Sequence, residues 1–156
     1  MSSTKQKRLF IIDGYATLYR AHYALIRNPL TNSAGTPTSA IFGFANQVFQ
    51  LIEEEKPDYL VAAFDSKGKN FRHEIFEEYK ANRSEMPDEI QTQLPYLWKL
   101  LEGMNIPLLR VDGVEADDII GTVARQCNDN GLQLSLIHIS EPTRRTPISY
   151  AVFCLK

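Results

Sequence analysis

The sequence is poor in cysteine, has no long apolar run and carries no large excess of either charge. Its two cysteines, Cys127 and Cys154, lack the spacing of a disulfide framework or a cysteine metal site, which indicates a reducing compartment. No stretch approaches the roughly 20 apolar residues of a membrane-spanning helix, and no apolar segment of a signal peptide follows the basic N-terminus. We therefore expect a cytoplasmic chain that does not enter a membrane.

The charge balance also limits the kinds of ligand. The net charge is -2 over 156 residues, so the chain is not a protein that binds polyanions over its whole surface. Any contact with nucleic acid must come from a local basic patch. Because 44% of the residues are hydrophobic and 23% are charged, the composition is that of one globular domain with a substantial core.

Three apolar runs are typical of strands in a parallel sheet. The run from Arg8 to Asp13 and the run from Tyr59 to Asp65 are apolar on both faces, as central parallel strands are, and each ends in aspartate. A third, shorter run extends from Ile106 to Val111. The carboxyl ends of parallel strands meet at one edge, where open α/β sheets bind their ligands. A single aspartate before a glycine is also common in turns, so the repetition is the informative feature.

Three further acids lie where the third run passes into a helical pattern. Glu115, Asp117 and Asp118 fill three of four consecutive positions, and helical spacing predicts that Glu115 and Asp118 share a face. Acids at a helix N-terminus complement the helix dipole, which is the competing explanation. With Asp13 and Asp65 they make five acids on one edge. Crowded carboxylates repel one another unless a cation is present, and hard divalent cations prefer oxygen ligands. The pattern therefore favours a metal site.

The remaining periodicity predicts helices around this sheet. We expect a helix over Tyr15 to Ile26, a strongly amphipathic helix capped by Thr38 or Ser39 and ending near Glu55, and a helix from Pro87 to Gly103. Leu132 to Ile139 has the pattern of a fourth strand. The fold class is therefore α/β, with a central, mostly parallel sheet flanked by helices. The residues expected on the buried side of the second helix are Ile41, Phe44, Ala45, Val48, Phe49 and Ile52.

The segment from Lys67 to Arg83 is basic and aromatic. Its basic and aromatic residues recur at spacings that place them on one broad face of a helix, and they are Arg72, Phe76, Tyr79, Lys80 and Arg83. Basic side chains neutralise phosphates, and an aromatic ring among them stacks on a base. A solvated amphipathic helix, with Glu74, Glu77 and Glu78 opposite, is the alternative. Arg20 in the first predicted helix is a further candidate contact to DNA.

Beside an acidic metal site, this basic face favours metal-dependent hydrolysis of nucleic-acid phosphodiesters. A bound metal polarises the phosphoryl oxygen and activates water, and basic side chains stabilise the developing charge.

Four ordered motifs resemble the 5′-nuclease (flap endonuclease-like) domain of bacterial DNA polymerase I. The similarity covers residues 7 to 133, and its motifs are Ile11-Ile12-Asp13-Gly14, Ala63-Phe64-Asp65, Phe71-Arg72 through Tyr79-Lys80-Ala81-Asn82-Arg83, and Val114-Glu115-Ala116-Asp117-Asp118. The resemblance implies a PIN-like fold, 5′→3′ exonuclease and flap cleavage in replication and repair, dependence on Mg²⁺ or Mn²⁺, and DNA with a 5′ end or flap as the partner.

The resemblance also assigns roles to individual residues. It makes metal ligands of Asp13, Asp65, Glu115, Asp117 and Asp118. It places Arg72, Tyr79, Lys80 and Arg83 on a helical arch over the single-stranded 5′ end, with Lys80 and Arg83 acting catalytically at the scissile phosphate.

The last 23 residues depart from this pattern. Leu134 to Arg144 and Ile148 to Leu155 resemble the two ends of a translated sequencing adaptor, separated by three residues that an index would encode. We expect residues 1–133 to be the N-terminal part of the exonuclease domain and residues 134–156 to be adaptor read-through; a genuine amphipathic tail is the alternative. The sheet and the second metal site are then incomplete at the C-terminal side, and the chain as written is inactive or nearly so.

Other functions fit the sequence less well. A non-catalytic remnant that binds DNA 5′ ends would retain the basic arch without turnover. A small-molecule phosphohydrolase that forms an aspartyl phosphate would need a second acid close after the nucleophile, whereas Asp13 is followed by Gly-Tyr-Ala. A purely structural or interaction protein leaves the five acids of the edge without a role.

Overall fold

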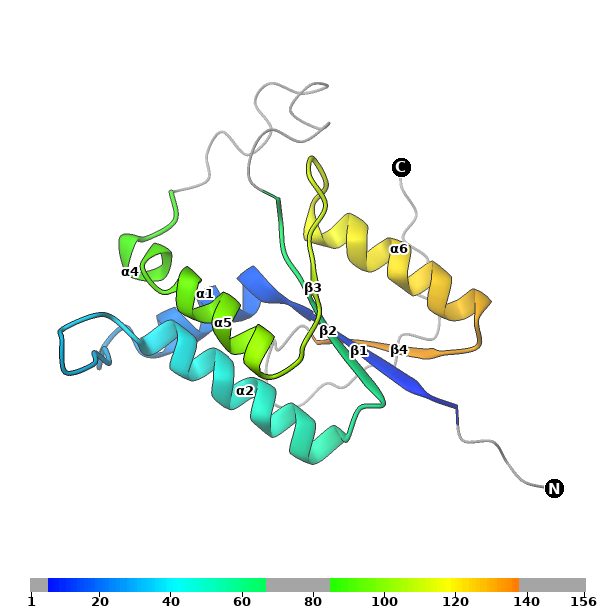
Figure 1. Cartoon of the computed structure of the whole chain (residues 1–156), viewed down its shortest axis with the longest axis horizontal. Helices are drawn as coiled ribbons and strands as arrows, with labels where there is room; N and C mark the ends of the chain where they lie inside the picture. Colours follow the sequence, from blue (N-terminus) through cyan, green and yellow to red (C-terminus); the bar gives the residue numbers. More distant parts are fainter. Residues whose placement is uncertain (1–5, 67–84, 138–156) are drawn as a thin grey trace.

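The expected parallel sheet is present in the computed structural model, which describes residues 6–66 and 85–137. Its strands are β1 (Arg8–Asp13), β2 (Tyr59–Ala63), β3 (Leu108–Leu109) and β4 (Gln133–Ile137). They pair in the order β3-β2-β1-β4, and every pairing is parallel (Figure 1). Asp13 pairs with Ala63, so the two aspartate-terminated runs end side by side.

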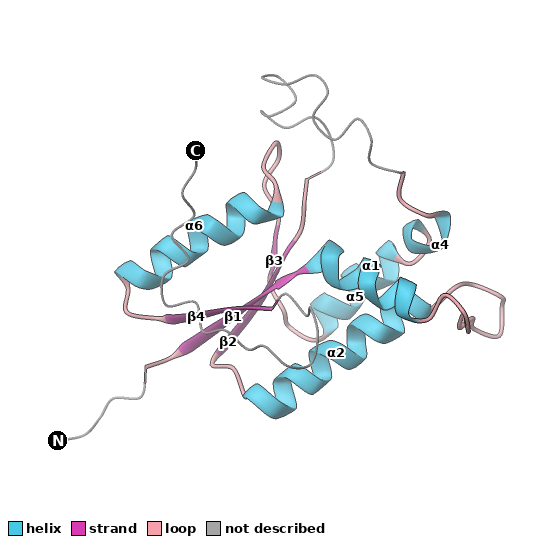
Figure 2. Ribbon diagram, turned by 180° about the vertical axis from the view of Figure 1, so that it is seen from behind, coloured by secondary structure: helices cyan, strands magenta, loops and turns pink. Residues whose placement is uncertain are grey.

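Helices cover both faces of the sheet. The helix α6 (Ala116–Asp129) lies on one face, whereas α1 (Gly14–Ala24), α2 (Ser39–Glu55) and α5 (Leu94–Gly103) lie on the other, as Figures 1 and 2 show. The short helix α4 (Asp88–Gln91) precedes α5. Within the described ranges, no helix combines the length and the apolar character that crossing a bilayer requires.

Alternation along the strands divides the core into two clusters. Ile12 packs in the cluster beneath α1, α2 and α5, whereas its neighbour Ile11 packs in the cluster beneath α6, because successive strand side chains point to opposite faces. Phe64 belongs to the first cluster and meets the rings of Tyr15 and Trp98 edge to face, at centroid distances of 5.1 and 4.8 Å. A Cβ added at Gly14 would lie 2.1 Å from Cζ of Phe64, so this junction of β1 and α1 requires glycine.

The buried stripe of α2 is narrower than the sequence predicts. Phe44 and Val48 are fully buried, but Phe49 is 51% exposed and Ile52 is 38% exposed. Phe49 stands about 140° around the helix from Phe44, since each residue advances about 100°. With only one side of α2 packed against the molecule, an apolar side chain at that angle faces solvent. The expected burial of Phe49 and Ile52 is therefore wrong.

Two other elements differ from expectation. The single helix expected from Pro87 to Gly103 is divided into α4 and α5, because Pro95 cannot donate a backbone hydrogen bond and is suited to the first turn of a new helix. The third strand is only two residues long. The chain leaves the sheet after Leu109 and turns at Gly113, whose φ is 75°.

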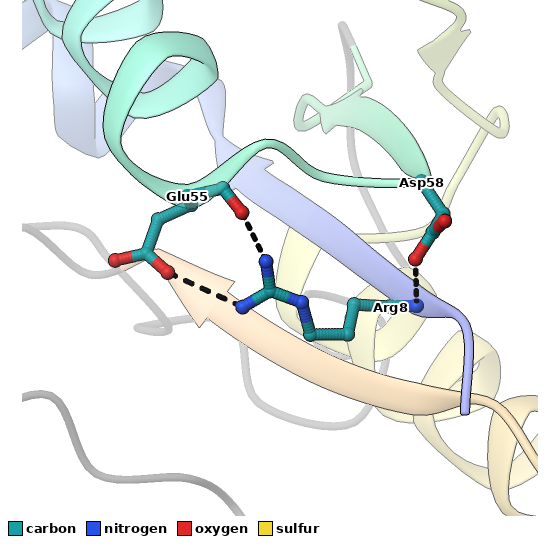
Figure 3. A network of polar contacts seen from close by, with 3 residues as sticks. All are labelled: Arg8, Glu55 and Asp58. Carbon is teal, nitrogen blue, oxygen red and sulfur yellow. Dashed lines mark hydrogen bonds and ion pairs between the residues drawn. The ribbon is translucent and has the colours of Figure 1, made fainter. Parts of the chain in front are cut away.

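Contacts from Arg8 fix the start of β1 to the end of α2 (Figure 3). The Arg8 guanidinium donates to both the side chain and the main-chain carbonyl of Glu55, and the Nη1–Oε2 distance is 3.3 Å. The backbone N–H of Arg8 donates to Asp58 Oδ2 at 2.8 Å. These contacts lie at the amino end of the strand, opposite the acidic edge.

Candidate metal and DNA site

The first acid of the candidate site also begins a helix. Asp13 is the last residue of β1 and the N-cap of α1, and its Oδ1 accepts a hydrogen bond from the backbone N–H of Ala16 at 3.1 Å. Aspartate is favoured at this position because its side chain satisfies an N–H that has no partner within the helix. Since its side chain is half-buried, the capping bond fixes a carboxylate at the carboxyl end of the central strand.

The second acid connects the sheet to α6. Asp65 follows β2 by two residues, and its Oδ1 accepts a hydrogen bond of 2.7 Å from the backbone N–H of Ala116. This bond spans 51 positions in the sequence. It brings the start of α6, and with it the third group of acids, to the edge where β1 and β2 end.

The loop between β3 and α6 is held against the end of β2 by two more hydrogen bonds. The N–H of Gly113 donates to Ser66 Oγ at 3.0 Å, and the N–H of Ser66 donates to the carbonyl of Val114 at 3.4 Å. In Figure 1 this loop stands beside the end of β2. The loop therefore has a defined position relative to Asp65.

The acids of this loop have different environments. Glu115 is the N-cap of α6, with extended backbone (φ −85°, ψ 156°), and its residue is 8% exposed. Asp117 is exposed and Asp118 is half-buried in the first helical turn, where both complement the helix dipole. The carbonyl of Glu115 accepts from the N–H groups of Asp118 and Ile119 at 3.1 and 3.2 Å, so Glu115 closes the first turn of α6, and that it shares a face with Asp118 stays a prediction.

The acids lie at one edge but do not form a compact ligand set. Among the residues that the structure describes, no group of three or more His, Cys, Asp or Glu side chains is close enough to hold a metal ion. The donor chemistry nevertheless fits a hard divalent cation, because the edge offers carboxylate oxygens. Glu115 is also the one buried charged residue among those described.

Two residues at this edge were not anticipated from the sequence. Tyr15 is half-buried with its ring against Phe64. Burial raises the pKa of its hydroxyl, the charge of Arg110 opposes that shift, and the charge of Asp65 adds to it. The hydroxyl is therefore a protonated hydrogen-bond donor at neutral pH, close to both charges. An aromatic residue in a helix and an arginine after an apolar run are both common in sequences, so neither Tyr15 nor Arg110 could be recognised as a site residue from the sequence.

The candidate DNA contacts are less completely placed. Arg72, Tyr79, Lys80 and Arg83 lie outside the described residues. Arg20 is half-buried on α1. It lies about 10 Å along the helix axis from Asp13, at 1.5 Å for each of seven residues.

Comparison with known proteins gives this edge a context. The profile of a family described as "5'-3' exonuclease, N-terminal resolvase-like domain" matches residues 8–140. The DNA polymerase I of Caldicellulosiruptor bescii is 46% identical over 130 residues, which are 83% of this chain and 15% of that protein. A 5′-3′ exonuclease of Aquifex aeolicus is 40% identical over 130 residues, and the match spans 44% of its length. The chain thus spans less than half of these relatives.

Solved structures share the fold. The T5 D15 protein, co-crystallised with metal ions, superposes with a TM-score of 0.60 at 21% identity, covering 83% of this chain and 48% of that one. The bacteriophage T5 flap endonuclease, in a pseudo-enzyme-product complex with DNA and metal ions, gives a TM-score of 0.56 at 20% identity, with the same coverage of 83% and 48%. With the profile match over 8–140, these findings show that the chain belongs to the 5′-3′ exonuclease family, as the N-terminal domain of the kind found in DNA polymerase I.

Proposed function

We propose that this chain is part of a metal-dependent 5′-3′ exonuclease and flap endonuclease that acts on DNA with a free 5′ end during replication and repair. The observation that carries the proposal is the junction of β1, β2 and α6. Asp13 ends β1, Asp65 follows the adjacent parallel strand β2 by two residues, and the bond from Ala116 to Asp65 holds Glu115 at the same edge. Relatives at 40–46% identity are named DNA polymerase I and 5′-3′ exonuclease, which supports DNA as the substrate.

Each part of the chain has a role in this proposal. Mg²⁺ or Mn²⁺, when bound, would polarise the phosphoryl oxygen and lower the pKa of a bound water. Its proposed ligands are Asp13, Asp65, Glu115, Asp117 and Asp118. The proposed DNA contacts are Arg20, Arg72, Tyr79, Lys80 and Arg83, of which Lys80 and Arg83 would act at the scissile phosphate by stabilising charge.

Turnover by this chain is expected to be very low. The family is expected to carry further acids after the strand that follows α6, whereas this sequence has none between Asp129 and Glu141. Without part of its ligands, a two-metal site loses orders of magnitude in rate. A second candidate function therefore fits the same residues: a fragment that binds DNA 5′ ends without cleaving them.

A flap-cleavage assay distinguishes these functions. The purified chain should bind 5′-flap DNA with an affinity that falls steeply as salt rises. With Mg²⁺ or Mn²⁺ it should cleave orders of magnitude more slowly than the Aquifex aeolicus exonuclease assayed beside it. Residual cleavage that disappears in Asp118→Ala supports the nuclease, and binding without any cleavage supports the binding fragment. Robust turnover that Asp118→Ala abolishes would contradict the expected inactivity, and failure to bind flap DNA at low salt would contradict both functions.

We also propose that residues 134–156 are encoded by a sequencing adaptor. Leu134 and Leu136 of β4 pack against the cluster beneath α6. That position needs only alternating apolar side chains in an extended strand, so a segment of any origin with this pattern fits it. The family profile matches as far as residue 140, beyond the proposed boundary at residue 134. We attribute this extension to the same strand-like pattern of apolar residues.

The gene itself tests the origin of this segment. Sequencing uncloned genomic DNA across codon 134 should show a reading frame that continues into different residues, with acids after the strand. Finding the codons for 134–156 uninterrupted in genomic DNA would refute the adaptor origin.

A further inference from the structure

Arg110 stands at the acidic edge, on the loop that carries Glu115. It directly follows β3, whose Leu109 pairs with Ala63 of β2. The N–H of Phe64 donates to the carbonyl of Leu109 at 3.0 Å. Arg110 is therefore beside the segment that leads from Phe64 into Asp65.

We expect the side chain of Arg110 on the face opposite α6, although this residue lies just beyond the last paired position of β3. Leu109 packs against the cluster beneath α6, and alternation along an extended chain directs the next residue to the other face. Phe64 and the ring of Tyr15 pack on that other face. The electrostatic effect of Arg110 on the pKa of the Tyr15 hydroxyl agrees with this placement. Arg110 and Tyr15 thus line the α1 side of the edge.

Hydrogen bonds pre-organise this arginine relative to the acids. Four hydrogen bonds of 2.7 to 3.4 Å fasten the loop from Arg110 to Glu115 to the segment that follows β2. Before the loop, Leu109 bonds to Phe64. Gly113 and Val114 both bond to Ser66, and Ala116 bonds to Asp65. A backbone held at both ends limits how far the base of the Arg110 side chain can move from Asp65.

The charge of Arg110 is available to a ligand. Arg110 is exposed. If the three residues that follow each of β1, β2 and β3 are compared, Arg110 is the one basic residue among them. Between described residues, the one ion pair within 4.0 Å joins Arg8 to Glu55 at the far end of β1. A guanidinium presents its donors as a planar fork that matches two phosphate oxygens.

We propose that Arg110 is a phosphate-binding residue, which contacts a phosphate of the DNA strand as the strand reaches the acidic edge, with the Tyr15 hydroxyl as a second donor. This inference rests on the proposed function, because it requires DNA at the edge. A positive charge there offsets the repulsion between the DNA backbone and the surrounding carboxylates.

The test is fluorescence anisotropy of labelled 5′-flap DNA with the full 156-residue chain, in EDTA so that no cleavage occurs. Arg110→Ala should weaken binding about tenfold at 50 mM salt and reduce the slope of log affinity against log salt by about 1, as loss of one phosphate contact does. Arg110→Lys should recover the slope but not the full affinity, since lysine keeps the charge and loses the fork. Tyr15→Phe should produce a smaller loss.

Arg125→Ala is the matched control. Arg125 is also exposed but lies on α6, about 14 Å from the start of that helix at 1.5 Å per residue. The same change of net charge there should leave both affinity and slope within error of the wild type. Melting curves of the arginine variants should coincide with that of the wild type, because both arginines are exposed.

The possible outcomes separate the two proposals. If the wild type binds and Arg110→Ala equals Arg125→Ala, Arg110 is not a phosphate contact and the proposed function is unaffected. If Arg110→Ala weakens binding with an unchanged salt slope, the loss is not that of a phosphate contact and the inference is again wrong. If the wild type does not bind flap DNA, the proposed function fails and this inference fails with it.

Discussion

Replacing Phe44 by alanine is expected to lower the free energy of unfolding by about 3–5 kcal/mol, the usual range for removing a buried phenylalanine. Phe44 is 0% exposed. It lies in the cluster that joins α1, α2 and α5 to the sheet, so its loss leaves a cavity where these helices meet. Urea denaturation followed by circular dichroism measures the change.

The same helix supplies the control for this prediction. Phe49 has the same chemistry and lies five positions further along α2, but it is 51% exposed. Phe49→Ala should change the free energy of unfolding by no more than about 0.5 kcal/mol. Equal losses in the two variants would contradict the packing of α2. Should Phe44→Ala prevent folding altogether, Phe44→Leu retains most of the volume and should give a smaller, measurable loss.

This contrast shows where sequence periodicity is sufficient and where it is not. The run from Arg8 to Asp13 predicted β1 with its correct bounds, because a strand covered on both faces must be apolar throughout. A helix packed on one side has no such constraint at its flanks. Phe44 and Phe49 are the same residue type on the same helix, and the position of the neighbouring helices decides that Phe44 is buried and Phe49 exposed.

In the candidate site, too, some features could be predicted from the sequence and others could not. Asp13 and Asp65 could be placed at one edge from sequence, because the carboxyl ends of parallel strands must coincide. The bond between Asp65 and Ala116 and the position of Arg110 beside Phe64 could not. Both depend on how a loop lies against a strand that is 46 to 51 positions away in the sequence, and a local sequence pattern contains no information about such a contact.

Replacing Asp65 by alanine is expected to have two separable effects. The backbone N–H of Ala116, a residue that is 4% exposed, would lose its acceptor at 2.7 Å. A buried donor without a partner costs about 1–3 kcal/mol, so the melting temperature should fall. If the edge binds Mg²⁺ as proposed, the wild type should also gain stability with rising Mg²⁺, since a ligand of the folded state stabilises it by RT ln(1 + [L]/Kd). Asp65→Ala should lack this gain.

Asp65→Asn distinguishes the structural role from the metal-binding one. Asparagine keeps an oxygen in the position that accepts from Ala116 N–H, but its neutral amide is a poorer ligand for a hard cation than a carboxylate. Its melting temperature without metal should therefore stay near that of the wild type, while the rise with Mg²⁺ disappears. KCl at matched ionic strength controls for screening of the acidic edge. If Asp65→Asn still responds to Mg²⁺ as the wild type does, Asp65 serves only to hold α6 against the sheet, and any metal binds through the other acids.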